Sequence, residues 1–521
     1  MKRKLRALLG LEEKVNQPPR TFSFCLLVSS LLMNPGMADD RGRVRVSVAG
    51  GNTETMATLK EHVTRSGNKF ALNLYLRVSE KANAENILLC PYGVNTSLGM
   101  AYAGAAGETA EEIARTLQFQ LPPSDLAAAL KLLNPAQDRR RFLWGIRAED
   151  NNRYGVRIAE VRPQTPASLG RLRPNDLILS IDNSPIRCEE DLARAVDFST
   201  GTIDVTAYNY ATGVVMDHRV KLEATDSNPS PAKIQQIFSV ANGLWNQDGL
   251  PLRTDFVETL LGSYGAHADS ADFARNPSEA VQKINSWTAA QTNGKIGSLF
   301  DEANLGKDTK LLLTNGVYFE AAWDHVFDRT RTRAAEFRVS SEKSIRTQMM
   351  NQTDEFRYVQ SKDCQCLELP YAESRFSMVI FLPQDITGLK ALTESLTERY
   401  EAFIREMRPV QVSVSLPKFS LTGAYELQEQ LAAMGMTSAF SGRANFSKMS
   451  DSGELMLSKV VHKVFVRVDE VGTKAGAATG TVAVPRLQPI EFRADRPFFF
   501  VIRDRVSEGI VFAGRIVQPE E

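Results

Sequence analysis

The sequence has few of the residues from which most metal centres and catalytic sites are built. It holds five cysteines and five histidines among 521 residues, and they are scattered rather than grouped with the spacing of zinc ligands. Cys364 and Cys366 are two apart on an expected strand, so their side chains point the same way and cannot easily bridge each other. No Gly-x-Ser-x-Gly segment is present to offer a nucleophilic serine. We therefore expect no metal, no cofactor and no catalytic residue, which indicates that the protein is not an enzyme.

The sequence also lacks an excess of charge of either sign. It has 62 Lys and Arg residues against 62 Asp and Glu residues, for a formal net charge of zero. Without a basic block, neither nucleic acid nor an anionic membrane is expected as a partner. A membrane span is not expected either, because the apolar run over residues 22–33 falls short of the about 20 apolar residues that a bilayer requires.

That apolar run has the features of an export signal. It follows a positively charged region at residues 2–6 and ends in small residues at 36–38, before two aspartates. A positive start, an apolar core of about 7–15 residues and small residues before a cut are typical of such signals. We expect residues 1–38 to be an export signal and the protein to be secreted or periplasmic. A misassigned start or a disordered tail is the alternative.

What the sequence has in place of a catalytic motif is a tract of small residues between positions 473 and 484. Side chains alternate along a strand, so one face of this tract would carry only alanine and threonine. Glycines and alanines make a permanent strand unfavourable, because glycine costs backbone entropy and packs nothing. The tract can therefore form a strand without being obliged to, and a low-complexity surface loop is the alternative. The face that could enter a protein interior consists of Thr473, Ala475, Ala477, Thr479, Thr481 and Ala483.

The flanks of this tract resemble the reactive-centre loop of the serpins, a family of serine protease inhibitors. The family's hinge motif, Glu-x-Gly-Thr followed by small residues, is matched by Glu470, Gly472 and Thr473. In the family the cut bond follows the residue sixteen positions after the hinge glutamate, which here is Arg486, before Leu487. The resemblance implies a reactive-centre loop over residues 470–489.

Further motifs extend the serpin resemblance over most of the chain. Asn315, Trp323 and His462 match positions of the family's shutter and breach, the regions where its central sheet opens. Cys90 and Gly93 stand where the family usually has serines, so the polar network of the shutter is expected in altered form. The matching segments are Asn86 to Pro91, Thr314 to Trp323, Leu416 to Phe419 and Leu457 to Lys463.

The serpin pattern is interrupted between residues 134 and 231. Residues 141–223 resemble a PDZ domain of the kind found in bacterial periplasmic proteases, chiefly through the segment from Pro166 to Asp182. Such a domain binds a terminal carboxylate with backbone N–H groups and pairs a strand edge with the peptide. A helix over 189–196 would form the second wall of the groove. The residues expected to form the carboxylate loop and the groove strand are Tyr154, Gly155, Val156 and Ile158. A structural insertion whose groove binds nothing is the alternative.

A chain of 521 residues exceeds one ordinary domain, which fits one large core with an insertion. We expect an α+β protein with the serpin fold, in which a large central antiparallel sheet, helices and a second β-region are interrupted by a β-barrel-like PDZ domain. The expected parts are the export signal over 1–38, a first serpin part over 56–137, the insertion over 141–223 and the remaining serpin part over 232–521.

The resemblance implies a suicide-substrate inhibitor, whose loop is cut by a serine protease and then inserts into the sheet. A guanidinium at Arg486 pairs bidentately with a buried carboxylate, which favours trypsin-like proteases as targets. We expect a monomer that traps such a protease covalently and also binds a peptide or protein C-terminus. The alternative is a non-inhibitory scaffold that acts through its PDZ groove.

Overall fold

The structure is a computed structural model, and it describes most of the chain after residue 52. Within residues 53–520 the parts that it does not describe are 83–84, 120, 134–141, 151–154, 183, 187–191, 193–194, 197–201, 225–236, 293, 300, 303–304, 373–374, 454 and 471–487. The expected export signal over 1–38 lies outside the described residues. In the described part, no helix combines the length and apolar character that a membrane crossing needs.

The larger of the two sheets of the main body has nine strands and a fully buried middle. Every residue of β16, β21 and β22 is buried, as expected for strands covered on both faces. The path of the sheet runs through β1 (Ile87–Leu89), β22 (Ile510–Ile516), β21 (Phe498–Asp504), β16 (Phe376–Pro383), β15 (Cys364–Pro370), β14 (Ser344–Gln360), β17 (Arg408–Pro417) and β20 (Ile490–Arg493), and β13 (Arg333–Arg338) pairs with β14.

The second sheet of the body has five strands, and its central pair is parallel. Its order is β11 (His267–Ala271), β10 (Ile237–Gln247), β12 (Leu311–Glu320), β19 (Leu457–Val468) and β18 (Phe419–Glu426). β10 pairs antiparallel with β12 and β18 with β19, but β10 with β11 and β12 with β19 are parallel. The expectation of an antiparallel sheet therefore holds for only two of the four pairings. Parallel neighbours need long crossover connections, and about 135 residues separate β12 from β19.

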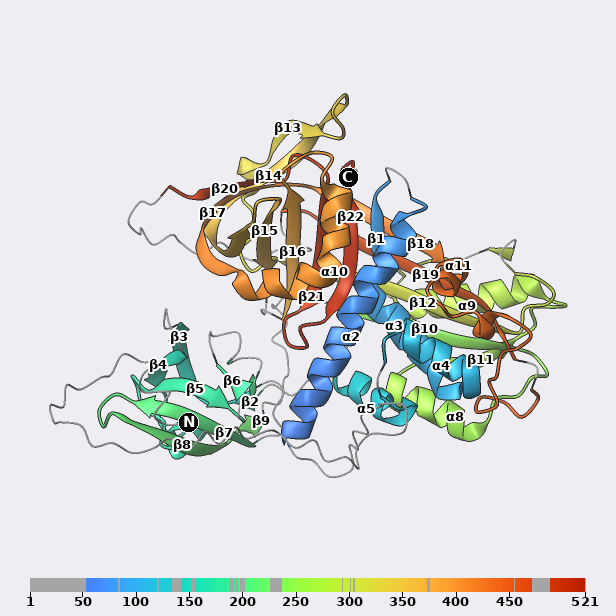
Figure 1. The fold of residues 1–521 in the computed structure, drawn as a ribbon, viewed down its shortest axis with the longest axis horizontal. Helices are drawn as coiled ribbons and strands as arrows, with labels where there is room; N and C mark the ends of the chain where they lie inside the picture. Colours follow the sequence, from blue (N-terminus) through green and yellow to red (C-terminus); the bar gives the residue numbers. More distant parts are fainter. Residues whose placement is uncertain are drawn as a thin grey trace, which may run out of the picture. The chain divides into compact units, whose positions relative to one another are not determined.

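Helices cover the two sheets and complete the α+β fold (Figure 1). α3 begins at a proline, which suits the first helical position because its missing N–H would be unpaired there in any case. It is buried along nearly its whole length and packs against α2, α5, β12 and β22. The helices of the body are α2 (Thr53–Ser79), α3 (Pro91–Gly104), α4 (Gly107–Thr116), α5 (Pro123–Leu133), α8 (Thr254–Thr259), η1 (Leu260–Tyr264), α9 (Pro277–Gln291), η3 (Arg329–Arg331), α10 (Leu389–Glu406), α11 (Gln428–Ala433) and η4 (Ser438–Phe440).

Between α5 and β10 the chain forms a separate sheet with its own core, hereafter the insert. The core includes Trp144, Val156, Ile158 and Ile178 and shares no residue with the cores of the body. The sheet is an open one, because its end strands β3 and β8 do not pair in the part that the structure describes, so the expected barrel-like closure is wrong. The elements are β2 (Phe142–Leu143), β3 (Ile146–Asp150), β4 (Val156–Val161), α6 (Pro166–Leu169), β5 (Leu177–Ile181), β6 (Ser184–Pro185), β7 (Thr202–Asn209), β8 (Val214–Lys221) and β9 (Glu223–Ala224).

Candidate functional site

The loop hinge begins at Glu470, directly after β19, and this residue is held by a dense set of contacts. Its carbonyl oxygen accepts a hydrogen bond from the Phe327 N–H at 2.9 Å. Its carboxylate accepts one from the Thr332 hydroxyl at 2.9 Å and lies 3.3 Å from the Lys418 ammonium. Burial by itself would raise the pKa of Glu470, but the backbone and Thr332 hydrogen bonds and the Lys418 charge outweigh it and lower the pKa below its usual value. The start of the loop is therefore fixed to the body as a charged, hydrogen-bonded residue.

Trp323 fixes the other side of the hinge. Its indole N–H donates to the carbonyl oxygen of Asp469 at 2.9 Å, and its ring stacks on Tyr371 at 4.4 Å between centroids and 8° between planes. The tryptophan is 2% exposed, so it holds Asp469, the residue that follows β19, in a fixed position. The structure thus brings Trp323 to Asp469, the residue before Glu470.

The shutter residues form a buried polar chain beneath the parallel pair β12–β19. The Cys90 N–H donates to Nε2 of His462 at 2.9 Å, so the proton of the neutral imidazole is on Nδ1, which lies 2.6 Å from Oδ1 of Asn315. Burial lowers the pKa of His462 to about 3, which keeps the ring neutral. The Asn315 amide donates to Oδ1 of Asn242 at 2.5 Å, and the Ser97 hydroxyl donates to the same oxygen at 2.9 Å. β12 and β19 are therefore linked by side chains as well as by their backbone.

Sequence reasoning missed Asn242 and Ser97. The signal for Asn242 was available only through strand pairing, because Asn242 stands opposite Asn315 in the β10–β12 register. Ser97 lies on α3, one helical turn after Gly93, and so points toward the same place.

Gly93 is matched to this network by its lack of a side chain. A Cβ at residue 93 would lie 2.6 Å from both Nδ2 and Oδ1 of Asn315, closer than real contacts allow. The neighbouring Cys90 is buried, and burial raises the pKa of its thiol to about 12, so it remains protonated. The expected alteration of the shutter is therefore specific: glycine makes room for the Asn315 amide, and Ser97 and Asn242 extend the chain of hydrogen bonds.

Of the loop expected over 470–489, residues 471–487 lie outside the described residues. Beyond them β20 anchors the distal end of the loop by pairing in parallel with β17 from Val412 to Ser415. The expected loop residues that the structure leaves undescribed are Gly472, Thr473, Ala475, Ala477, Thr479, Arg486 and Leu487.

In the insert, two of the residues expected to line a peptide groove lie in the core instead. Tyr154 lies outside the described residues, and Val156 and Ile158 are fully buried in the insert's core. β4 is paired with β3 on one side and with β5 on the other, so its edge is not open to a further strand. Gly155 has φ +76°, and a Cβ there would lie 2.5 Å from the Ile178 carbonyl oxygen. The expectation that β4 offers the groove edge is therefore wrong, because Gly155 allows β5 to approach closely and, in the described part of the insert, β4 is an inner strand whereas β3 is an end strand.

The helix expected over 189–196, as the second wall of the groove, is described only in part. Leu192, Ala195 and Val196 are helical, and Leu192 and Val196 are buried, while the remainder of 189–196 lies outside the described residues.

Cys364 and Cys366 are both buried, unbridged thiols. Across the described residues, no group of three or more His, Cys, Asp or Glu side chains could hold a metal ion.

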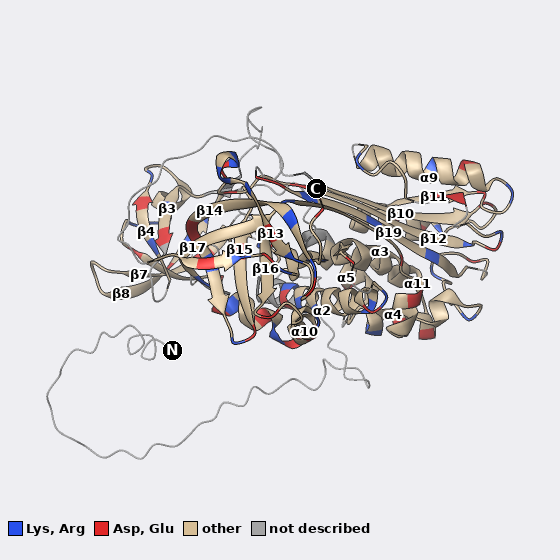
Figure 2. Ribbon diagram, turned by 90° about the horizontal axis from the view of Figure 1, so that it is seen from above, with Lys and Arg blue, Asp and Glu red and all other residues tan. Residues whose placement is uncertain are grey.

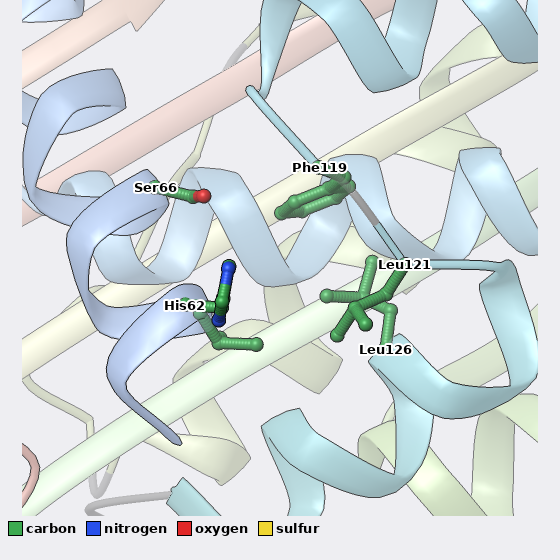
Figure 3. Close-up of a pocket in the computed structure, with 6 residues that line it drawn as sticks. His62, Ser66, Phe119, Leu121 and Leu126 are labelled. Carbon is green, nitrogen blue, oxygen red and sulfur yellow. The ribbon is translucent and has the colours of Figure 1, made fainter. Parts of the chain in front are cut away.

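A small crevice lies between α2 and α5, the last helix before the insert (Figure 3). His62 and Ser66 on α2 face Phe119, Leu121 and Leu126 across it. The lining is mostly apolar and brings no charged pair together, so it offers no arrangement for acid–base or nucleophilic chemistry.

Comparison with known proteins places this geometry in a family. A family model described as Serpin (serine protease inhibitor) matches residues 65–159 and 213–519, most of the chain. The chain belongs to the serpin family. The stretch of this serpin that the family model leaves unmatched, 160–212, lies within the insert.

Relatives of this serpin align with it over their full length. Serpin B10 of Rhinolophus ferrumequinum is 31% identical over 469 residues, covering 88% of this chain and 100% of that protein. Leukocyte elastase inhibitor of Bos taurus is 30% identical over 470 residues with the same coverage. The family description and the second name denote protease inhibitors, so the expectation that this protein is not an enzyme is confirmed.

Solved structures agree on the fold. Uncleaved ovalbumin matches with a TM-score of 0.63 at 23% identity, covering 88% of this chain and 100% of ovalbumin. Human thyroxine-binding globulin complexed with thyroxine matches with a TM-score of 0.64 at 22% identity, covering 89% of this chain and 100% of that one. The serpin fold expected from the sequence is confirmed.

Proposed function

We propose that this serpin inhibits serine proteases by taking its cut loop into the five-stranded sheet. The observation that carries the proposal is the parallel pair β12–β19, with the hinge directly after β19. A strand that turns at Glu470 and runs back would be antiparallel to β19. Since β12 runs parallel to β19, the same strand would be antiparallel to β12 as well, and it could form a ladder on both sides.

The tract after the hinge suits such an insertion. The side chains due to point inward are alanine and threonine, so none of them adds a buried charge or overfills a packed core. About ten newly paired residues would contribute about 0.5–1.5 kcal/mol net for each hydrogen bond, enough to drive a large rearrangement. The contacts that oppose it are the polar chain from Cys90 to Asn242 and the clamp on Glu470, which hold the sheet closed until the loop is cut.

The insertion would inhibit because an acyl-enzyme forms before the loop moves. The protease's serine attacks the carbonyl carbon of Arg486, the bond to the Leu487 nitrogen breaks, and the serine ester links enzyme and inhibitor. Dragging the protease across the molecule would displace its oxyanion hole and catalytic triad, whose action requires close positioning. Arg486 makes trypsin-like enzymes the proposed targets, because their buried carboxylate pairs bidentately with a guanidinium.

The test uses the full chain and trypsin. We expect a covalent complex that survives SDS, together with a separate C-terminal fragment that begins at Leu487, and we expect both to be lost in Arg486→Glu while Arg486→Lys retains them. Thr473→Arg would place a charge on the inward face, and it should turn the inhibitor into a substrate that is cut and released. Cleavage of the unaltered chain at Arg486 without any stable complex would overturn inhibition and favour the non-inhibitory scaffold.

We further propose that the insert binds a peptide or protein C-terminus at β3. β3 is an end strand of its sheet and pairs only with β4 in the described part, which leaves one row of backbone groups open. It begins just after Gly145, whose φ of +78° lets the backbone turn tightly beside Thr165. Bound in this way, a ligand would tether the inhibitor near its target and raise the local concentration without altering the trap.

Fluorescence anisotropy with a labelled peptide that ends in an apolar residue tests this second role. We expect binding of the free carboxylate form, weak or no binding of the amidated form, and loss of binding in Ala148→Pro, which removes an N–H group from β3. Equal binding of both peptide forms would contradict carboxylate capture. Trypsin trapping measured with and without the peptide separates tethering, which leaves the rate unchanged, from a coupling to the loop.

Export remains a proposal, supported by the residue pattern over 1–38 alone. Fractionation of the native host with an antibody to the insert checks it. We expect the chain outside the cytoplasm and shortened at its amino terminus, and full-length protein in the cytoplasm alone would contradict it.

A further inference from the structure

Exposed apolar side chains gather on one part of the insert. Seven large hydrophobic residues are exposed in the described part of the chain, and four of them belong to the insert. Leu169 at the end of α6 is 73% exposed, Val214 and Met216 on β8 are 47% and 41% exposed, and Tyr210 stands in the turn that leads into β8. Single exposed hydrophobics need no explanation, but four around one strand indicate a surface that is covered by a partner.

Two contacts join the end of α6 to the second half of β8. The Gly170 carbonyl oxygen lies 2.9 Å from Nδ1 of His218, and Gly170 approaches Val220 so closely that a Cβ would lie 2.7 Å from its Cγ2. His218 and Val220 are on the same face of β8 as Val214 and Met216, because side chains of a strand alternate. Leu169, next to Gly170, therefore flanks the apolar face of β8.

β8 is also an end strand. It pairs only with β7 in the part of the insert that the structure describes, so a row of backbone N–H and C=O groups along its outer side is open to a further strand. Its other face carries opposite charges two residues apart, Asp217 and Arg219, and both side chains are exposed. Within the insert, Asp217 accepts a hydrogen bond from Thr206 and Arg219 lies 3.8 Å from Asp204, so both charges are already oriented across β7 and β8.

We propose that β8 is the interface between two copies of this chain, paired antiparallel about His218. In that register Asp217 stands opposite Arg219 of the second copy, and Arg219 stands opposite the second copy's Asp217. Opposite charges that stand directly across an antiparallel pair attract each other. Pairing about residue 217 or 219 instead would set Asp217 against Asp217 or Arg219 against Arg219, which repel. The two sheets become one continuous sheet, with each charge flanked by a partner on both sides.

The same register covers the exposed apolar residues. Met216 stands opposite Val220 of the second copy, and Val220 lies against Gly170, beside Leu169. Each Met216 thus meets the α6 edge of the other copy, and the twofold arrangement makes both halves equal, as an isologous interface requires. This differs from the monomer expected from the sequence. The interface is small, so we expect a weak dimer that forms at high concentration and loosens as salt screens the charge pairs.

The test is sedimentation velocity of the full chain over a wide range of concentration at low salt. We expect a monomer–dimer equilibrium that Asp217→Arg or Arg219→Asp shifts toward monomer by at least tenfold in dissociation constant. The double variant D217R/R219D again sets opposite charges against each other and should restore most of the affinity. Met216→Ser, which keeps the charges, should also weaken the dimer.

Circular dichroism and trypsin trapping control for the fold of each variant, because β8 is not part of the inhibitory machinery and both should be unchanged. A chain that stays monomeric at all concentrations overturns the proposal. So does a dimer that the single charge variants leave intact, since its interface would lie elsewhere, and so does a double variant that stays as monomeric as the single ones.

Discussion

The five-stranded sheet of the body and the sheet of the insert are open in opposite places. In the body, the proposed site for a further strand is in the middle, between the parallel strands β12 and β19, which a buried chain of hydrogen bonds links. In the described part of the insert, the middle strands are paired on both sides and the end strands β3 and β8 on one side only. An end strand accepts a partner at no cost to its own sheet, whereas an internal site requires existing contacts to be broken first. This difference agrees with the functions proposed above, a triggered and irreversible event in the body and reversible binding by the insert.

Of the substitutions that test this comparison, removal of the His462 side chain should lower the unfolding free energy of the body the most. His462→Ala leaves the Cys90 N–H and the Oδ1 atom of Asn315 without these partners in a dry interior, at about 1–3 kcal/mol for each group, and it also leaves a cavity. We expect a fall of several kcal/mol in the unfolding free energy of the body, measured by urea titration of the intact chain.

The matched control is His218→Ala in the insert, whose ring makes one hydrogen bond, to Gly170. It should leave the urea transition of the body in place. Equal effects of the two substitutions would show that the body and the insert unfold together, which would undo the comparison.

Acid should weaken the body through the same histidine. Burial lowers the pKa of His462 to about 3 from an ordinary value near 6.5. Between these values the unfolded chain binds a proton that the folded chain does not, so stability is complete above about pH 6.5 and declines as the pH falls toward 3. From pH 7 to pH 5 this contributes a loss of about 2 kcal/mol. Urea midpoints across that range check it, and His462→Gln should flatten the slope; an unchanged slope would assign the loss to other groups.

Gly93 tests how tightly the shutter is packed. Gly93→Ser restores the residue that the family usually carries, but its Cβ would overlap the Asn315 amide and force it to move. We expect a loss of about 1–2 kcal/mol in the unfolding free energy of the body, from overpacking and a broken hydrogen bond. Because the sheet would then open more easily, the cut loop should also insert faster, which stopped-flow trapping of trypsin measures. A more stable Gly93→Ser variant would mean that the amide has another favourable position.

Sequence motifs identified the parts of the body whose chemistry is local. The hinge glutamate, Trp323 and the pair of Asn315 and His462 were all named from short motifs. The structure places Trp323 against the residue before the hinge glutamate and, separately, Asn315 against His462. Asn242 and Ser97 were missed because their role depends on strand register and on the packing of α3 against β10, which no single segment encodes. The parallel direction of β12 and β19 was missed for the same reason, since it follows from crossovers rather than from either strand's residues.

The insert shows a different limit of sequence reasoning. Its Gly155 was expected in a carboxylate-binding loop, but the backbone that comes close to it is that of β5. Val156 and Ile158 are apolar both in a groove and in a core, so their residue types alone could not tell the two apart. Only the order β3–β4–β5 decides between them, and that order depends on contacts between segments about 20 residues apart.

The clamp at the hinge gives a smaller effect. Glu470→Gln keeps the shape and the Thr332 contact but removes the charge that faces Lys418 at 3.3 Å. Because both side chains are largely buried, we expect a loss of about 1 kcal/mol in the unfolding free energy at pH 7, with a faster passage of the intact loop into the sheet on prolonged warming. The loss should vanish at low pH, where the carboxyl of the unaltered chain is itself protonated. A constant loss at every pH would indicate that shape rather than charge matters there.

The smallest effect is expected at a surface ion pair of the insert. Glu149 on β3 pairs with Arg147 at 2.8 Å and with Arg157, but all three side chains are 40% or more exposed. Exposed pairs contribute little because water and salt screen them, so Glu149→Gln should alter stability by less than about 0.5 kcal/mol and leave trypsin trapping unchanged. The change removes a charge at the open edge of β3 without removing any backbone group, so a peptide held by the backbone should still bind. Lost binding in this variant, with the fold intact, would mean that side-chain charge, not the strand edge, recognises the ligand.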